Sequence, residues 1–263
     1  TLLQQLYYDK NISRDPKSLY VTEPYFDPKT KIFYHNGMKK QMPIFSDFHR
    51  KVEEYAIKNN DQEMKDLSKS LLMFKKGGIY DMFDCYTSES LANFKDAPIV
   101  TFDVSKLEEN ILRPIGMYVA LSWTWEKFVK KNPQIKKRIV CDEAWMLVSK
   151  NMAGSEYTAT FLENAARRIR KRNGGLLVAS QNFTEFARST QGEAVLKQAI
   201  TNIFLGQDPT DVDALQDTFK LSDGEKIFLM GAKRGQMLIK MHNESATVQV
   251  IPFEFEKSLI EKK

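Results

Sequence analysis

The sequence predicts an α/β protein whose core is a mostly parallel sheet with an antiparallel edge, preceded by a mostly helical subdomain. From Ala97 onward, short apolar runs alternate with amphipathic helical patterns, which is typical of a parallel sheet covered by helices. Residues 1–96 carry mainly helical periodicity with one hairpin-like insertion. The composition, 42% hydrophobic and 28% charged residues in a chain of 263, is that of a globular protein with a sizeable core. We therefore expect a helical subdomain over 1–96 and a core over 97–263.

The helical subdomain is expected to contain two helices and one hairpin. Residues 31–45 predict the hairpin, because Asn36-Gly37 suits a two-residue type I′ turn. The first helix is expected to use Ser46 or Asp47 as its N-cap, since both side chains can accept a bond from a backbone N–H. The second helix repeats the same apolar spacing and is expected to stop at Gly77-Gly78.

The core shows strands and helices in alternation. Strands are expected at 97–105, 138–145, 175–181 and 201–207. Helices are expected between them and after the last one, at 111–133, 156–174, 186–200 and 209–219. Two further strands around the turn "GAKRGQ", and a third at 246–254, predict the antiparallel edge.

Charge, cysteines and hydropathy set broad limits on the class of protein. The net charge of +5 is compatible with an anionic partner but is no evidence for one. Cys141 lies inside an expected core strand, which predicts a free buried thiol and fits a reducing compartment. No run of about 18 apolar residues predicts a membrane span. Because Thr1 already lies within an amphipathic pattern, we interpret the chain as a fragment of a longer protein.

Two adjacent acids, Asp142 and Glu143, follow the apolar run of the expected strand 138–145. Ligands of open parallel sheets bind beyond the carboxyl ends of the strands, where these acids lie. An apolar run ending in Asp-Glu is the Walker B pattern of ATPases, in which the Asp holds or orients Mg²⁺ and the Glu polarises the attacking water. The pattern is also common by chance. On these two residues alone, surface acids at a strand end are the better interpretation.

Gln181 gives the next expected strand a polar group at its own carboxyl end. Adjacent parallel strands would bring Gln181 close to Asp142 and Glu143. Its amide can donate and accept, so it could contact a γ-phosphate or the attacking water. The alternative is a glutamine that bonds only to loop backbone.

A dense basic cluster closes the helix expected at 156–174. Five of six positions are cationic: Arg167, Arg168, Arg170, Lys171 and Arg172. Cations at a helix C-terminus stabilise the helix dipole, and Gly174 is expected to end the helix. A solvated helix end is therefore the better interpretation of Arg170 and Lys171. One of the other three arginines could reach a neighbouring subunit's site as an arginine finger. A nucleic-acid contact is a third possibility.

Arg234 is the remaining candidate residue, in the Gly-rich turn expected between two strands. A solvated arginine in a hairpin would explain it equally well. The three histidines, His35, His49 and His242, lie far apart in the sequence, and so do the two cysteines. No spacing typical of metal ligands therefore exists.

Several segments, in this order and spacing, resemble a known family. They are "PIVTFDVSKLEE", "RIVCDEAWMLV", "ENAARRIRKRNGGLLVASQNF", "ITNIFLGQ" and "GAKRGQMLI", with "KGGIYDMFD" upstream. The chain resembles the C-terminal ATPase domain of the TraC- and TrwK-like ATPases of conjugation and type IV secretion, relatives of the FtsK/HerA motors. The resemblance covers nearly the whole chain.

The resemblance implies a RecA-like core with a helical subdomain, hexamer formation and hydrolysis of ATP with Mg²⁺. It implies that Asp142 and Glu143 are the Walker B pair and that Gln181 is the sensor glutamine. An arginine of the 167–172 cluster, together with Arg234, would match the family's basic positions. The implied location is the cytoplasmic face of a bacterial inner membrane, with membrane-embedded components of a secretion machine as partners and nucleic acid at most indirectly.

The P-loop motif of such ATPases, G-x-x-x-x-G-K-[ST], is absent, and the sequence contains no Gly-Lys pair. In the family that it resembles, this motif lies upstream of Thr1. Without the backbone cradle and lysine of the P-loop, phosphate binding loses its main source of affinity. We expect the chain to carry half an active site and to be inactive alone. The alternative is a non-catalytic interaction or nucleic-acid-binding module that retains a motor-ATPase fold.

Overall fold

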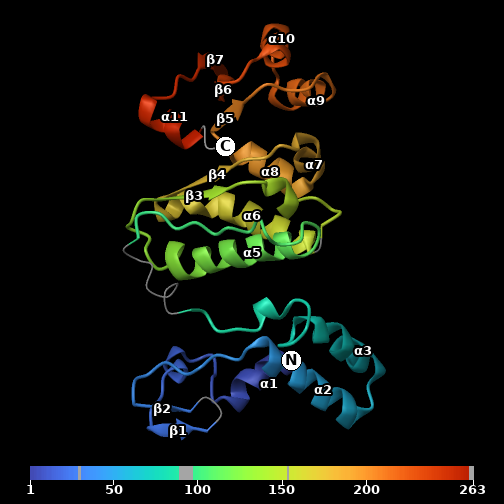
Figure 1. Ribbon diagram of the computed structural model, residues 1–263, viewed down its shortest axis with the longest axis vertical. Coiled ribbons are helices and arrows are strands. Elements are labelled where there is room, and N and C mark those ends of the chain that lie inside the picture. The colour runs from blue at the N-terminus through green and yellow to red at the C-terminus, as the bar shows by residue number, and fades with distance from the viewer. Residues whose placement is uncertain (29–30, 89–96, 153, 261–263) are drawn as a thin grey trace. The chain divides into compact units, whose positions relative to one another are not determined.

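The structure is a computed structural model that describes residues 1–28, 31–88, 97–152 and 154–260. It divides into two compact units, Thr1–Val100 and Thr101–Lys263 (Figure 1). None of the described helices is long and apolar enough to cross a membrane.

The first unit is built from short helices and one small hairpin. Its elements are α1 (Leu2–Asp9), η1 (Pro16–Leu19), β1 (Tyr25–Asp27), β2 (Ile32–Tyr34), α2 (Phe45–Asn59), α3 (Gln62–Leu71), η2 (Leu72–Phe74) and η3 (Asp81–Phe83). Helices α2 and α3 pack together, and Val52 and Ala56 of α2 are buried. The buried His49 ring lies 3.2 Å from the Ser68 hydroxyl, so a polar pair joins the two helices.

The expected hairpin and helix start differ from the structure. Strand β2 pairs antiparallel with β1, which precedes it, and not with residues after Asn36-Gly37. The turn at Gly37 is not type I′, because Gly37 has φ +81° whereas Asn36 has no positive φ. Helix α2 begins at Phe45 with Ile44 as its N-cap, so Ser46 and Asp47 lie inside its first turn. The Asp47 carboxylate instead accepts a bond from the Ile44 N–H, at 3.3 Å.

The second unit contains two small sheets and a layer of helices. The elements are α5 (Leu112–Thr124), the π-helical turn η5 (Trp125–Val129), β3 (Lys137–Cys141), η6 (Ala144–Leu147), α6 (Ser155–Arg168), η7 (Ile169–Arg172), β4 (Gly174–Val178), α7 (Phe183–Arg188), α8 (Thr190–Gln198), β5 (Thr201–Phe204), α9 (Pro209–Phe219), α10 (Asp223–Gly231), β6 (Gln236–Met241), β7 (Glu244–Gln249) and α11 (Glu254–Ile260). The predicted α/β class is confirmed.

The strands of the second unit form one parallel pair and one antiparallel sheet. Strands β3 and β4 are parallel, with Cys141 opposite Val178, whereas β5, β6 and β7 form an antiparallel sheet in that order. The expected strand at 97–105 is not formed, and the first of the two strands expected around "GAKRGQ" is helix α10. A capping box formed by Ser222 and Glu225 fixes the start of that helix. This local signal outweighs the strand preference of the apolar residues that follow it.

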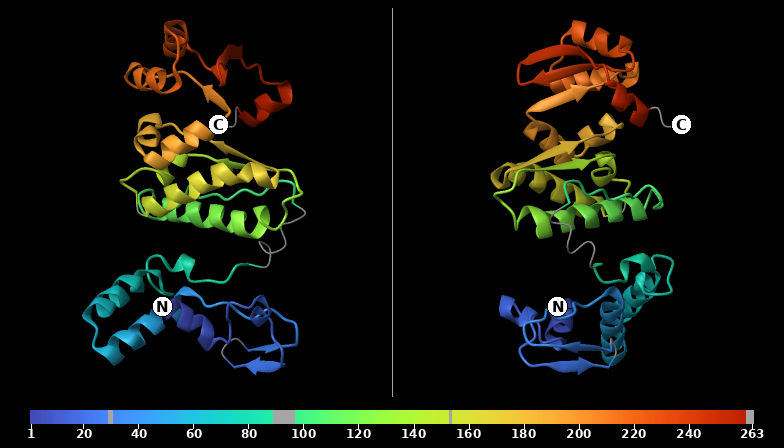
Figure 2. Two further views of the ribbon diagram at one scale, coloured as in Figure 1. Left: turned by 180° about the vertical axis from the view of Figure 1, so that it is seen from behind. Right: turned by 60° about the vertical axis from the view of Figure 1, so that its left-hand side comes forward.

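One face of the β3–β4 pair is covered by helices and forms the core. Ile139, Cys141, Leu176 and Val178 point into two apolar clusters to which α5, α6 and α8 contribute. Figure 2 shows these three helices side by side along the pair. On the opposite face the paired residues Val140 and Leu177 are 62% and 45% exposed.

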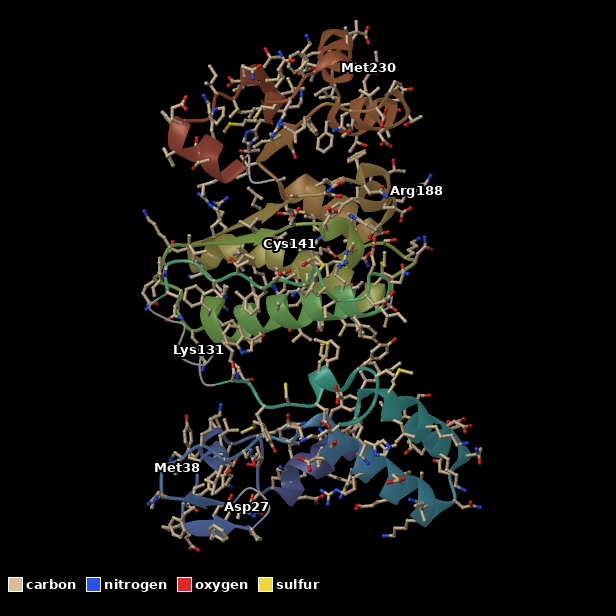
Figure 3. The ribbon with its side chains drawn as sticks, in the orientation of Figure 1. Asp27, Met38, Lys131, Cys141, Arg188 and Met230 are labelled. Carbon is tan, nitrogen blue, oxygen red and sulfur yellow. The ribbon has the colours of Figure 1, made fainter. Side chains whose placement is uncertain are left out.

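Cys141, labelled in Figure 3, lies on the covered face of β3, and Cys85 is exposed. Both cysteines are free, as predicted for Cys141. Burial, and after it the charge of Asp142, raises the pKa of the Cys141 thiol to about 12. The thiolate is the reactive form, so Cys141 stays unreactive at pH 8.

We expect a chromogenic disulfide reagent at pH 8 to modify one thiol of the folded chain and two in denaturant. Cys85→Ser should remove the native-state reaction and leave one thiol in denaturant. Two thiols reacting at equal rates in the folded chain would contradict the burial of Cys141.

Candidate active site

Asp142 and Glu143 lie beyond the carboxyl end of β3. The ladder between the two strands continues past the strand end, because Ala179 N–H donates to the Cys141 carbonyl at 2.9 Å and Ala144 N–H donates to the Ala179 carbonyl at 3.0 Å. Between these bonds the chain turns sharply: Glu143 adopts φ 49° and ψ 37°. The exposed Asp142 carboxylate accepts the Glu143 N–H at 3.0 Å, which supports this turn.

The carboxylate of Glu143 is held on both oxygens. The Gln181 amide Nε2 donates to Oε1 at 2.6 Å, and the Trp145 indole Nε1 donates to Oε2 at 2.6 Å. Gln181 follows β4 as Glu143 follows β3, so the pairing of the two parallel strands brings these side chains together. Gln181 therefore lies next to Glu143, as predicted, and Trp145, which the sequence does not predict, lies there as well.

A cavity of about 550 Å³ opens at this end of the β3–β4 pair. This volume is within the range of small-molecule sites. Its walls are Glu109, Arg113, Glu143, Trp145, Met146, Gln181, Asn182 and Asp211. The cavity thus has three acids and one arginine, which suits a ligand that brings its own cation.

Arg113 is another wall residue that the sequence does not predict. It lies in the first turn of α5, and its Nη2 donates to the carbonyls of Ser105 and Leu107 at 3.1 and 3.2 Å. Its Nη1 lies 3.8 Å from the Glu109 carboxylate. A lone arginine at a helix start carries no spacing signal in a sequence, so only the fold reveals that it lines the same cavity as Glu143 and Gln181.

The basic cluster lies at the other end of β4. Helix α6 and η7 carry it, and β4 begins two residues after Arg172. At about 3.3 Å per residue, the five-residue strand β4 separates the cluster from Gln181 by roughly 15 Å. In its own chain the cluster therefore lies away from the cavity.

Members of the cluster differ in their contacts. Arg167 forms an ion pair with Glu163 at 2.7 Å, and Arg172 donates to the Lys130 carbonyl at 3.4 Å. Among the described residues, Arg168 has no hydrogen-bond or ion-pair partner and is exposed. Of Arg167, Arg168 and Arg172, Arg168 is therefore the one whose guanidinium forms no hydrogen bond or ion pair with the described residues.

The end of the basic helix differs from the expected glycine closure. Asn173, with φ 52°, is the left-handed cap, and Gly174 already belongs to β4. Gly174 is required for space, because a Cβ there would lie 2.4 Å from Cγ1 of Ile169.

Arg234 lies in a turn between helix α10 and strand β6, and not between two strands as expected. The neighbouring Gly235 has φ +85°, which makes this turn possible. Arg234 is exposed and does not belong to the walls of the cavity around Glu143.

No group of three or more His, Cys, Asp or Glu side chains converges as a metal site within the described parts of the chain. A Mg²⁺ ion is usually held by one or two carboxylates together with substrate phosphates. Asp142 is exposed and precedes the wall residue Glu143 without itself lining the cavity, so it fits this kind of shared site and not a site formed by protein alone.

Comparison with known proteins identifies the family. The sequence profile described as "TraG P-loop domain" matches residues 33–250. The chain belongs to the TraG P-loop domain family. The resemblance to the ATPases of conjugation and type IV secretion is thereby confirmed, although this member of the TraG family has no P-loop motif within the given sequence.

The solved structure of a VirB4 protein shows the same fold. VirB4 of Thermoanaerobacter pseudethanolicus superposes with a TM-score of 0.72 at 22% identity, over 97% of this chain and 63% of the VirB4 chain. The TraG-family chain thus spans less than two thirds of that relative. B204, the DNA-packaging ATPase of Sulfolobus Turreted Icosahedral Virus, gives a TM-score of 0.44 at 16% identity, over 68% of this chain and 78% of B204. No curated protein sequence matches significantly.

Proposed function

We propose that this chain is the C-terminal part of a motor ATPase that powers conjugative transfer or type IV secretion. The observation that carries the proposal is the contact between Glu143 and Gln181 beyond the carboxyl ends of β3 and β4, in a member of the TraG P-loop domain family. The site is where an open parallel sheet binds its ligand. The cavity, at about 550 Å³, has room for the phosphates of a nucleotide.

The residues divide the work of ATP hydrolysis. Glu143 orients and polarises a water whose oxygen attacks the γ-phosphorus, and its carboxylate accepts the water proton as the bond to the β–γ bridging oxygen breaks. The bond's electron pair leaves on ADP, and the proton passes on to solvent or phosphate. Asp142 would hold or orient Mg²⁺, and the ion would supply positive charge to neutralise the phosphates. Gln181, whose amide donates a hydrogen bond to Glu143, contacts the water or the γ-phosphate.

The complete motor is proposed to be a hexamer on the cytoplasmic face of a bacterial inner membrane. Its partners would be membrane-embedded components of a secretion or conjugation machine. In such a ring, an arginine of the 167–172 cluster and Arg234 would contact a neighbouring subunit's nucleotide. The separation of the cluster from its own cavity supports this arrangement.

We expect the chain alone to release no phosphate from Mg-ATP above the buffer rate. The physical reason is that the sequence lacks G-x-x-x-x-G-K-[ST], the backbone cradle and lysine that bind phosphates. The measurement is a coupled phosphate-release assay on the purified chain, with its Glu143→Gln variant as the matched control. Turnover that Glu143→Gln abolishes would show that the chain is a complete enzyme, whereas turnover shared by both preparations would be a contaminant.

A further inference from the structure

The side chain that restrains Glu143 from within its own turn is Trp145. The indole Nε1 donates to Oε2 of Glu143 at 2.6 Å. The ring is partly buried against the main apolar cluster of the second unit, and it also forms part of the cavity wall. Trp145 therefore joins a packed core to the carboxylate that faces the ligand.

The two donors on Glu143 differ in what they can do. An indole N–H is a donor only, so Trp145 has one way to bond to Glu143. The Gln181 amide carries both donors and an acceptor, so it can exchange its bond to Oε1 for one to a ligand or a water. The arrangement assigns Oε2 to a fixed partner and leaves Oε1 as the oxygen whose partner can change.

The backbone of Glu143 supports a functional interpretation of this contact. Glu143 lies in the left-handed region, with φ 49°, which residues other than glycine and asparagine seldom adopt. Such a conformation persists only where surrounding contacts fix it, and it is frequent at functional sites. Two hydrogen bonds fix this turn. The Asp142 carboxylate accepts the backbone N–H of Glu143, and the Trp145 indole donates to the Glu143 side chain.

We propose that Trp145 is a positioning residue of this site: its indole N–H holds Oε2 of Glu143, so that Oε1 is presented to the attacking water. The inference rests on the proposed ATPase function. A purely structural account is that a partly buried indole needs any acceptor, and Glu143 happens to supply one. The two accounts differ in what removal of the N–H does to turnover at constant nucleotide affinity.

The contact itself can be tested on the chain as it stands. Its three indole N–H groups, from Trp123, Trp125 and Trp145, give separate signals in a ¹H–¹⁵N spectrum, and Trp145→Phe assigns one of them. We expect Glu143→Gln to shift the Trp145 signal and to leave those of Trp123 and Trp125 in place. An unchanged Trp145 signal would overturn the proposal.

The role is tested in the full-length protein by removing only the N–H. 3-Benzothienylalanine placed at position 145 keeps the bicyclic ring and has sulfur in place of N–H; Trp145→Phe is the simpler variant. We expect kcat to fall by roughly 10–100-fold, the scale for a misplaced catalytic group, with nucleotide affinity and melting temperature close to wild type for the benzothienyl variant. Trp125→Phe is the matched control, since Trp125 packs on Phe161 in the core and does not line the cavity. Its kcat should stay at the wild-type value.

The outcomes separate this inference from the function on which it rests. If Glu143→Gln abolishes turnover but the benzothienyl variant keeps the wild-type kcat, Trp145 is a packing residue and the ATPase assignment stands. If Glu143→Gln itself turns over at the wild-type rate, the ATPase assignment of this site falls, and the positioning role falls with it. A benzothienyl variant that lowers melting temperature and nucleotide affinity together with kcat would also reject the positioning role.

Discussion

Glu143→Gln in the full-length protein should abolish ATP turnover and preserve nucleotide binding. The substitution keeps the size of the side chain and a hydrogen-bonding oxygen for Trp145, but it removes the charge that polarises water and accepts its proton. General-base catalysis contributes on the order of 10²–10⁴-fold in rate, so the loss should be near complete. Steady-state phosphate release gives the turnover, and equilibrium titration with a fluorescent ATP analogue gives the affinity.

Asp142→Asn is the comparison that distinguishes the two acids. We propose that its exposed carboxylate holds Mg²⁺, so this variant should lose Mg²⁺-dependent binding as well as turnover. Titrations with and without Mg²⁺ measure that difference. Wild-type hydrolysis by Glu143→Gln would show that the Walker B assignment is wrong.

The second large effect is expected between subunits. Alanine at Arg167, Arg168 and Arg172 together should inactivate the full-length protein, because removal of an arginine finger costs about 10³–10⁵-fold in rate. The cluster precedes β4 and Gln181 follows it, so these arginines cannot easily serve the cavity of their own chain. A neighbour in a ring can receive them.

Mixing two inactive parents tests this expectation. One parent carries Glu143→Gln and the other the triple alanine substitution; some interfaces of a mixed ring then combine an intact Glu143 with intact arginines. The mixture should hydrolyse ATP faster than either parent. Equal activity of mixture and parents, with subunit exchange verified by fluorescence, would show that the cluster acts in its own subunit or only caps a helix.

Single substitutions in the cluster sharpen this test. Because Arg168 is exposed and has no partner among the described residues, Arg168→Ala should account for most of the loss. Arg167 is paired with Glu163 and Arg172 with the Lys130 carbonyl, so their substitution should disturb local structure more than turnover. The matched control is Arg170→Ala with Lys171→Ala, which changes the same helix end and should leave turnover unchanged.

The contact between Glu143 and Gln181 could be predicted from the sequence, because it depends on the positions of two strands. The apolar runs before Asp142 and Gln181 indicate two strands, and parallel pairing then brings Glu143 to Gln181 without further information. Trp145 was not predicted, because a tryptophan in an apolar run is usually core and nothing in the spacing shows where its N–H points. Arg113 was missed because its position depends on how α5 and the loop before it fold together.

Local signals alone did not decide two elements of the first unit. Asn36-Gly37 does turn the chain, with the Met38 N–H donating to the His35 carbonyl at 3.1 Å, yet β2 pairs with β1, which precedes it, and not with residues after this turn. Ser46 and Asp47 are good caps by chemistry, but Ser46 bonds to the Asp84 carboxylate, and the N-cap is Ile44, two residues before Ser46. At Ser46 a contact distant in sequence thus outweighed a capping preference of roughly 1 kcal/mol.

The left-handed turn at Glu143 limits which substitutions can evolve there or serve as probes. Asparagine and glycine accept that backbone shape, whereas valine and isoleucine resist it because of their branched Cβ. Selection for folding alone would therefore enrich small polar residues at this position, while selection for turnover would retain glutamate. A lineage that gave up hydrolysis and kept the fold should drift toward Asn or Gly at position 143, and an aliphatic residue there would mark a turn that had been rebuilt.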